Sequence, residues 1–253
     1  MTQGYVIIAK NTPDTDYEQC ARVLQKSLRA VGDTRSVTII TDISDEGYGP
    51  YWGDHLAYQQ SPYDETFKLE ADLLVTRPLD SWWKLCYNRD LHIATGTRNY
   101  RQQLSTVRHY RQYNDRWNLP DCYNGITYFK KSNLASEFFG TVKCAFENWQ
   151  TIASVSDHYN GGYADTDSAY AHAAAVIGVE RCTMPNDIIQ WVHMKQRINN
   201  LLSENWTDEL VWELVGTDFR VNTISQLYPV HYHVKSLAQQ LEPLYDSYLQ
   251  TLL

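Results

Sequence analysis

The sequence has few cysteines, and those it has are far apart. The five are Cys20, Cys86, Cys122, Cys144 and Cys182. An odd number with no close pair argues against a disulfide framework and against a zinc knuckle. We therefore interpret most of them as small core residues of a protein from a reducing compartment.

Long apolar segments are also missing. No stretch reaches the roughly 18 consecutive apolar residues that a membrane-spanning helix needs. The opening segment MTQGYVIIAK has neither the basic head nor the small-residue cleavage site of a secretory signal. We therefore expect a cytoplasmic protein without a membrane partner.

Positive charge is scarce. The 253 residues contain 22 Lys and Arg against 30 Asp and Glu, which gives a formal net charge of -8. This balance disfavours non-specific adhesion to nucleic acid, although it does not exclude a local basic groove. Aromatic residues, by contrast, are abundant, with 19 Tyr and 8 Trp. We interpret them mainly as packing residues; the alternative is a set of stacking surfaces for sugars or bases.

The first forty residues predict a strand, a helix and a second strand. Tyr5–Ala9 and Val37–Thr41 are short apolar runs typical of buried strands. Between them, Thr15–Glu18 has the spacing of a capping box, so we expect a helix to begin there and to end at Gly32. This order predicts a βαβ unit, and with it a parallel sheet.

Further elements follow along the chain. Short apolar or alternating segments predict strands at 66–72, Leu91–Thr95, Ile126–Lys130 and Val176–Glu180. Apolar residues at helical spacing predict helices at Leu134–Trp149 and Ser168–Ala175. After Glu180 the pattern becomes mostly helical. The predicted fold class is α/β, with a core over 1–180, a mostly parallel sheet flanked by helices, and a helical C-terminal extension over 181–253 packed on it as one compact unit.

Two acids, Glu70 and Asp72, lie one residue apart in the predicted strand TFKLEAD. Alternate residues of a strand share a face, so both carboxylates point the same way near a strand end. Adjacent carboxylates repel each other unless a cation or a proton lies between them. Because ligands of open α/β sheets bind at the carboxyl ends of the strands, we interpret the pair as a site for a divalent cation on a diphosphate. The alternative is a solvated acid pair without a role.

Several segments, taken in order, resemble the GT-A glycosyltransferases, in which a DxD motif after a strand holds Mn²⁺ or Mg²⁺ on a nucleotide-sugar diphosphate. GYVIIAKNTPDTDY is similar to the opening strand and nucleobase loop, and VTIITD to the second strand. LEADLLV stands where the DxD motif does, with Glu70 in place of the first Asp. YNGITYFKKS is similar to the Asn-Gly strand under the donor sugar, and YADTDSAYAHA to an acidic turn before a helix. WVHMK and YPVHYHVK both resemble the late histidine segment.

The order of these motifs most resembles the glycogenin and galactosyltransferase-like branch. SPYDETFKLEADLLV also resembles glycosyltransferases of T-even-type bacteriophages. The resemblance implies transfer of a sugar from a nucleotide-sugar, a UDP-sugar above all, to an acceptor hydroxyl. Its phage-type part implies hydroxymethylcytosine in phage DNA as the acceptor, in the host cytoplasm. The sugar, the stereochemical outcome and the oligomeric state stay open.

The same resemblance assigns roles to particular residues. It implies a metal held by Asp72 and Glu70, with His193 or His233 as a further ligand, whereas His231 is interpreted as structural or at the rim of the site. Three residues are candidates for catalysis: Asn124, Asp165 and Asp167. Residues expected to hold the nucleotide-sugar are Ala9, Lys10, Asn11, Thr12, Tyr17, Asp42, Lys68, Glu70 and Gly125. One of the two acids at 165 and 167 is expected to cap a helix, which leaves the other for the acceptor hydroxyl or the anomeric carbon.

One segment, Arg98–Trp117, is locally basic in an acidic chain. Its arginines alternate with tyrosines and a tryptophan, a pattern that suits phosphate contacts and base stacking. We expect it to bind hydroxymethylated duplex DNA through Arg98, Arg101, Arg108, Arg111 and Arg116. The alternative is a solvated surface segment.

Other functions stay open at this point. A nucleotidyltransferase would use the same metal and diphosphate chemistry but would release pyrophosphate; the sequence lacks the Gly-rich, Lys-bearing phosphate loop expected near its start. A degenerate, non-catalytic binding module would explain Glu70 in the place of an Asp. A glycosyltransferase acting on a small molecule or a polysaccharide would need no basic DNA-binding segment.

Overall fold

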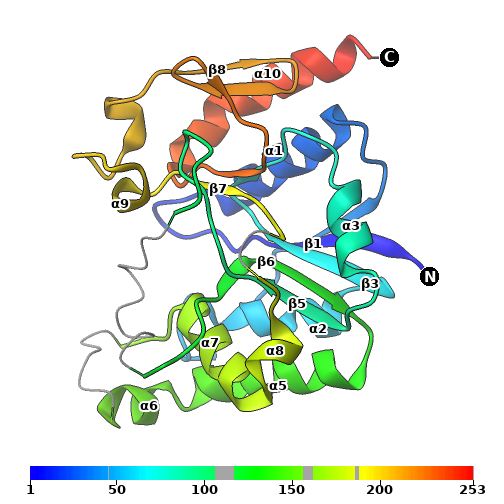
Figure 1. The fold of residues 1–253 in the computed structure, drawn as a ribbon, viewed down its shortest axis with the longest axis vertical. Coiled ribbons are helices and arrows are strands. Elements are labelled where there is room, and N and C mark those ends of the chain that lie inside the picture. Colours follow the sequence, from blue (N-terminus) through cyan, green and yellow to red (C-terminus); the bar gives the residue numbers. More distant parts are fainter. Residues whose placement is uncertain (45, 106–116, 156–161, 186–187, 253) are drawn as a thin grey trace.

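The structure is a computed structural model that describes residues 1–44, 46–105, 117–155, 162–185 and 188–252. Its centre is a five-stranded sheet in the order β2-β1-β3-β6-β5 (Figure 1). The strands are β1 (Gln3–Ile8), β2 (Ser36–Ile40), β3 (Glu65–Glu70), β5 (Leu91–Ala94) and β6 (Tyr123–Lys130). Within this sheet β1, β2 and β3 are parallel, and β6 runs antiparallel to both β3 and β5. The mixed, mostly parallel α/β architecture predicted from the sequence is therefore confirmed.

Both faces of the sheet are covered, which explains why Tyr5–Ile8 of β1 is an uninterrupted apolar run. Tyr5 and Ile7 belong to a core cluster with α1 (Tyr17–Ala30) and α10 (Ala238–Gln250). Val6, which points to the opposite face, belongs to a second cluster with α5 (Asn133–Glu147) and α7 (Thr166–Ile177). Figure 1 shows the two helix layers on either side of the sheet.

Helix α1 connects β1 to the parallel strand β2, so the predicted βαβ unit is confirmed. The cap itself differs from the expectation by one residue. Asp16, rather than Thr15, accepts the backbone N–H of Gln19 at 2.8 Å. At the other end, Gly32 adopts φ 82, a left-handed conformation that glycine reaches at little cost.

The strand expected at Val176–Glu180 is not present. Helix α7 continues to Ile177, and the short helix α8 (Val179–Cys182) begins after Gly178, whose φ is 111. Of the apolar residues of this segment, only Ile177 packs into the second core cluster, whereas Val176 and Val179 are exposed. The β-branched composition suggested a strand, but the glycine here forms a corner between two helices.

The mostly helical C-terminal extension also needs correction. The residues that the structure describes after Glu180 form five short strands: β7 (Val192–His193), β8 (Trp212–Val215), β9 (Asp218–Val221), β10 (Ile224–Ser225) and β11 (Val230–His231). Strands β8, β9 and β10 form one small sheet, and β7 and β11 form another with β4 (Leu73–Leu74). Pairing between distant segments therefore overrides the local helical pattern.

Shorter helices complete the structure. They are α2 (Leu56–Gln60), α3 (Asp80–Cys86), α6 (Trp149–Val155), α9 (Gln196–Asn199), and the 3₁₀ turns η1 (Trp52–His55), η3 (Trp206–Asp208) and η4 (Lys235–Leu237). None of the described helices is long and apolar enough to cross a membrane.

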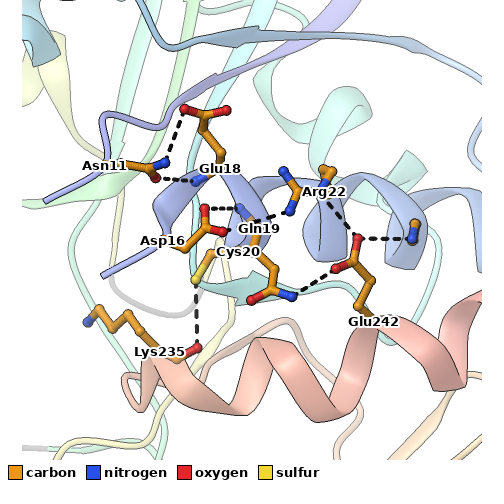
Figure 2. A network of polar contacts seen from close by, with 9 residues as sticks. Asn11, Asp16, Glu18, Gln19, Cys20, Arg22, Lys235 and Glu242 are labelled. Atoms are coloured by element: carbon orange, nitrogen blue, oxygen red, sulfur yellow. Dashed lines mark hydrogen bonds and ion pairs between the residues drawn. The ribbon is translucent and has the colours of Figure 1, made fainter. Parts of the chain in front are cut away.

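A polar network joins the C-terminal helix to the first one. Glu242 of α10 accepts hydrogen bonds from Gln19 at 2.9 Å and from Arg22 at 3.3 Å, both on α1 (Figure 2). Lys26 of α1 bonds the same carboxylate at 3.0 Å. These contacts hold α10 against α1. Helix α10 begins directly after the segment that carries His231 and Lys235.

Candidate active site

A pocket of about 410 Å³ opens at the carboxyl ends of β1 and β3, where α/β sheets commonly bind ligands. Asp54 and Thr166 belong to its walls. Six residues that the sequence analysis assigned to the donor or to catalysis line it as well: Lys10, Thr12, Tyr17, Lys68, Glu70 and Asn124. The structure thus brings together residues that are spread over much of the chain.

The acid pair lies at one edge of this pocket. Glu70 ends β3, and Asp72 follows after the buried Ala71. His231 lies between the two carboxylates: its Nε2 is 2.8 Å from Asp72 Oδ2, and its Nδ1 is 3.7 Å from Glu70 Oε2. Strand pairing produces this contact, because His231 of β11 is in register with Leu73 of β4, the residue after Asp72.

Tyr123, the first residue of β6, connects the same groups. Its hydroxyl donates to Glu70 Oε2 at 2.6 Å and lies 2.8 Å from His231 Nδ1. A hydroxyl has a single proton, so when that proton goes to Glu70, the imidazole Nδ1–H must donate to the tyrosine oxygen. Nε2 faces the Asp72 carboxylate at 2.8 Å, and this nitrogen would have to be free of its proton to bind a metal ion. Burial, together with the charges of Glu70 and Asp72, raises the pKa of Tyr123 well above its usual value.

Asp72 is only 1% exposed, yet it is held as a carboxylate. Its Oδ2 accepts from His231 and also from Lys235 Nζ at 2.9 Å. Burial alone would raise the pKa of Asp72, but the positive charges of His231 and Lys235 outweigh it and hold this pKa well below its usual range. Its other oxygen, Oδ1, is buried and has no hydrogen-bond partner among the described residues. A buried, unpartnered oxygen is costly, so a ligand at this position would relieve it.

The chemistry of these donors fits a divalent cation. Ligand atoms of Glu70, Asp72 and His231 lie within 4.8 Å of one another. Two carboxylates suit hard cations such as Mn²⁺ and Mg²⁺, and an imidazole nitrogen adds a ligand that Mn²⁺ accepts readily. The unpartnered Asp72 Oδ1 would offer such an ion a further oxygen.

The histidine that contacts the acid pair is His231, which the sequence analysis interpreted as structural. His193 and His233 stack on it, with ring centroids 4.6 and 4.7 Å from its own. Ligand atoms of the three imidazoles also lie within 4.8 Å of one another. His193 and His233 as metal ligands stay predictions, whereas His231 belongs to both groups of potential ligands.

Gly125 makes the approach of Glu70 to Tyr123 possible. A Cβ added at Gly125 would lie 2.5 Å from Glu70 Oε2 and 2.5 Å from the ring of Tyr123. Any side chain at this position would therefore push apart the acid and the hydroxyl. Gly125 therefore allows two side chains to approach each other closely, and a contact of Gly125 with the nucleotide-sugar stays a prediction.

The backbone of Asn124 is held from two sides at the floor of the pocket. Its N–H donates to Asp167 Oδ1 at 2.8 Å, and its carbonyl accepts from Lys68 Nζ at 3.1 Å. Lys68 is buried and pairs with Asp54, with an Nζ to Oδ1 distance of 2.6 Å. These contacts fix the start of β6 below the pocket.

The two acids before α7 have different partners. Asp165 is the N-cap: its Oδ1 accepts the N–H of Ser168 at 2.8 Å, and its Oδ2 accepts the Ser168 hydroxyl at 2.7 Å. Both oxygens of Asp165 are therefore used locally. Asp167 is the acid that reaches the pocket, through the backbone of Asn124.

Three further residues were assigned to the donor: Ala9, Asn11 and Asp42. Ala9 is buried, and its N–H donates to Ile40 O at 2.9 Å. The side chain of Asn11 bonds Glu18 of α1 (Figure 2). Asp42 lines a different pocket, of about 690 Å³, next to Trp52. We retain them as predictions for the nucleotide.

The arginine segment is only partly described. Arg98 donates to Gln190 Oε1 at 3.2 Å, and its guanidinium lies 5.1 Å from the ring centroid of Tyr228. Arg101 is exposed and lies over the ring of Tyr100, at 4.6 Å. The remaining candidates for DNA contacts lie outside the described residues: Arg108, Arg111 and Arg116.

No protein-family model matches the sequence, and no curated protein matches it. Among solved structures, the chain is similar to the galactosyltransferase LgtC in complex with donor and acceptor sugar analogs. That match has 12% identity and a TM-score of 0.56, and it covers 96% of this chain and 95% of LgtC. An active-site mutant of LgtC matches at 14% identity and a TM-score of 0.50, over 96% of this chain and 95% of that one. Mouse xyloside xylosyltransferase 1, in its apo form, matches at 11% identity and a TM-score of 0.48, over 91% and 97%.

At these identities the likeness to LgtC shows the fold alone. The chain has the GT-A architecture that the order of its motifs predicted.

Proposed function

We propose that the protein is a glycosyltransferase that moves a sugar from a nucleotide-sugar to an acceptor hydroxyl with the help of a divalent cation. The observation that carries this proposal is the cluster of Glu70, Asp72 and His231 at the edge of the pocket on a GT-A sheet. The contacts of Asp72 with His231 and Lys235 use Oδ2 and leave Oδ1 without a partner among the described residues. A cation that also binds a diphosphate would provide that partner.

The pocket supports a nucleotide-sugar as the donor. Its volume of about 410 Å³ lies within the range of small-molecule sites, roughly 300–1,000 Å³. Lys10 and Thr12 follow β1 at the end of the sheet where a nucleotide would enter. We propose a uridine nucleotide with Mn²⁺, held by residues 1–180 and closed by the segment of residues 181–253 that carries His231.

Glu70, Asp72 and His231 would hold the cation, which when bound neutralises charge on the leaving diphosphate. The chain itself adds Lys235, whose Nζ is 2.9 Å from Asp72. Burial lowers the pKa of Lys235, but the charge of Asp72 outweighs this effect and raises it, so Lys235 stays positive beside the diphosphate. The start of β6, fixed at Asn124, orients the sugar. Alignment of donor and acceptor is worth up to about 7–11 kcal/mol in ideal cases.

For the acceptor, the phage-type resemblance predicts hydroxymethylcytosine in duplex DNA. Arg101 is exposed, which suits a phosphate contact, whereas Arg98 is engaged with Gln190 and Tyr228. The test is transfer from a labelled nucleotide-sugar to hydroxymethylated and to plain duplex DNA. If neither duplex is labelled while the donor is hydrolysed, a small-molecule or polysaccharide acceptor replaces DNA.

A thermal-shift panel of nucleotide-sugars with and without Mn²⁺ tests the proposed function. Since a bound ligand stabilises by mass action, a donor at a hundredfold excess over its Kd should add about 2.7 kcal/mol of stability. We expect the shift with UDP-sugars to require the cation. Slow hydrolysis should then release UDP. Release of pyrophosphate would indicate a nucleotidyltransferase, and binding without turnover on any acceptor would indicate a degenerate module.

A further inference from the structure

A second pocket, of about 700 Å³, lies in the C-terminal part of the chain. Its walls come from the segment around α9, the turn before η3 and the loop after β11. The polar residues that line it are Lys195, Gln196, Arg197, Glu204, Asn205 and His233. None of them lines the 410 Å³ pocket. The second pocket therefore has two positively charged side chains, Lys195 and Arg197, and one acid, Glu204. This excess of positive charge contrasts with the net charge of -8 of the whole chain.

This pocket is adjacent to the proposed metal cluster. His233 lines the pocket and stacks on His231, at 4.7 Å between ring centroids. His231 in turn lies 2.8 Å from Asp72 Oδ2. A single imidazole therefore separates the second pocket from the residues that would hold the cation of the donor.

The backbone holds His233 in this position by an unusual conformation. Its φ is 63, which is left-handed and rarely adopted by residues other than glycine. The N–H of Val234 donates to the carbonyl of Tyr232 at 2.6 Å, which closes a tight turn around His233. Trp206 Nε1 donates to the same carbonyl at 2.6 Å. A strained backbone conformation persists only where neighbouring contacts enforce it, and the two hydrogen bonds to the Tyr232 carbonyl do so here. They keep the His233 imidazole between the second pocket and the metal cluster.

The charged groups of the pocket suit a single anionic group. Arg197 is exposed and makes no ion pair with any residue that the structure describes. Its planar guanidinium matches phosphate and carboxylate geometry. The side-chain amides are used locally, since Gln196 bonds Leu202 O and Asn205 bonds Asp208. Glu204 opposes a ligand that carries many negative charges.

We propose that this second pocket binds the acceptor, and that the acceptor is a small sugar carrying one phosphate or carboxylate group. The inference rests on the proposed transfer function, because the acceptor would lie beside His233, next to the cluster that would hold the donor diphosphate. Transfer would form a bond from the acceptor oxygen to the anomeric carbon and break the bond from that carbon to the diphosphate. The hydroxyl proton would pass to water, and the nucleoside diphosphate would leave.

The test measures binding of glucose, glucose 6-phosphate and glucuronate by ligand-observed NMR, with UDP and Mn²⁺ present. We expect at least one charged sugar to bind roughly tenfold or more tightly than glucose, the difference that one charge-assisted contact gives. Arg197→Gln should remove this preference. Arg220→Gln is the matched control, because Arg220 is a partly exposed arginine of the β8–β9 hairpin that pairs only with Glu213 and Asp218 among the described residues.

The outcomes separate the inference from the function on which it rests. The acceptor assignment fails if the three sugars bind alike, or if Arg197→Gln keeps the preference, while UDP still binds with Mn²⁺. If a charged sugar binds but UDP does not, the pocket is an anion site and both the transfer function and the acceptor role fail. Hydroxymethylated duplex DNA is a further arm: competition by DNA, dependent on Arg197, with no binding of single sugars would overturn the small-acceptor proposal in favour of DNA.

Discussion

Two pairs of acids that the sequence analysis assigned to the site have the same spacing, and their environments are opposite. Glu70 and Asp72 share His231, Asp72 also pairs with Lys235, and Asp72 Oδ1 is buried without a partner among the described residues. At the start of α7, each acid has an assigned backbone donor: Asp165 accepts from Ser168, and Asp167 accepts from Asn124. The comparison teaches that acid spacing alone does not identify a metal site. What distinguishes the first pair is converging ligand atoms together with an unsatisfied carboxylate oxygen.

The largest effect expected from this comparison is that of Asp72→Asn. The substitution keeps the shape but removes the charge that balances Lys235 and, we propose, the cation. We expect metal-dependent turnover of the nucleotide-sugar to fall by at least roughly a hundredfold, since a principal ligand of the metal is lost. Turnover per folded molecule is the measurement, with circular dichroism as the check on folding. Wild-type turnover with Mn²⁺ would remove Asp72 from the site.

A comparison of His231→Gln with His233→Gln shows which of the two stacked histidines binds the cation. His231 contacts Asp72, whereas His233 contacts it only through His231. We expect His231→Gln to weaken Mn²⁺ affinity by about 10–100-fold, and His233→Gln to weaken it clearly less. Calorimetric titration of both variants with Mn²⁺ is the measurement. The reverse order would make His233 the ligand, as the sequence analysis allowed.

Asp165→Ala should affect stability and not chemistry. Both oxygens of Asp165 bond Ser168, so its removal should cost about 1 kcal/mol in the free energy of unfolding, as for other N-caps. Urea denaturation and donor turnover are measured on the same variant. A large loss of turnover at unchanged stability would assign Asp165 to the reaction rather than to the cap.

Glu70→Asp is expected to have the smallest effect. The shorter side chain loses the 2.6 Å bond from Tyr123 but restores the common DxD pattern. We expect Mn²⁺ affinity to stay equal or to improve slightly, with activity retained. A complete loss of activity would give Glu70 a role that depends on its length, and the bond from Tyr123 is the contact that such a role would use.

The sequence predicted the part of this site that depends on local periodicity. Glu70 and Asp72 were found because residues two apart in a strand share a face. His231 was missed because its contact depends on the register of β11 with β4, two strands of two residues each that are far apart in the chain. The helical spacing around Val192 wrongly predicted a helix. Val192 instead lies in a strand that pairs with Val230, a contact between segments far apart in the chain.

Two further features depend on atoms that a sequence does not position. Gly125 was assigned to the nucleotide-sugar from a motif, and the structure adds that its missing side chain lets Glu70 and Tyr123 approach each other. Lys68 was assigned to the donor, and the structure gives it Asp54 and the carbonyl of Asn124 as partners. Side-chain partners of this kind become visible only when β3, β6 and η1 are placed in space.

The central claim is that Asp72 and His231 hold a divalent cation for a nucleoside diphosphate. The most direct test is an electron paramagnetic resonance titration of Mn²⁺ with UDP, on the wild-type protein and on Asp72→Asn. The account predicts that the wild type binds a single Mn²⁺, more tightly when UDP is present, and that the variant loses this site. Equal Mn²⁺ binding by the two proteins, or wild-type binding unaffected by UDP, would contradict it.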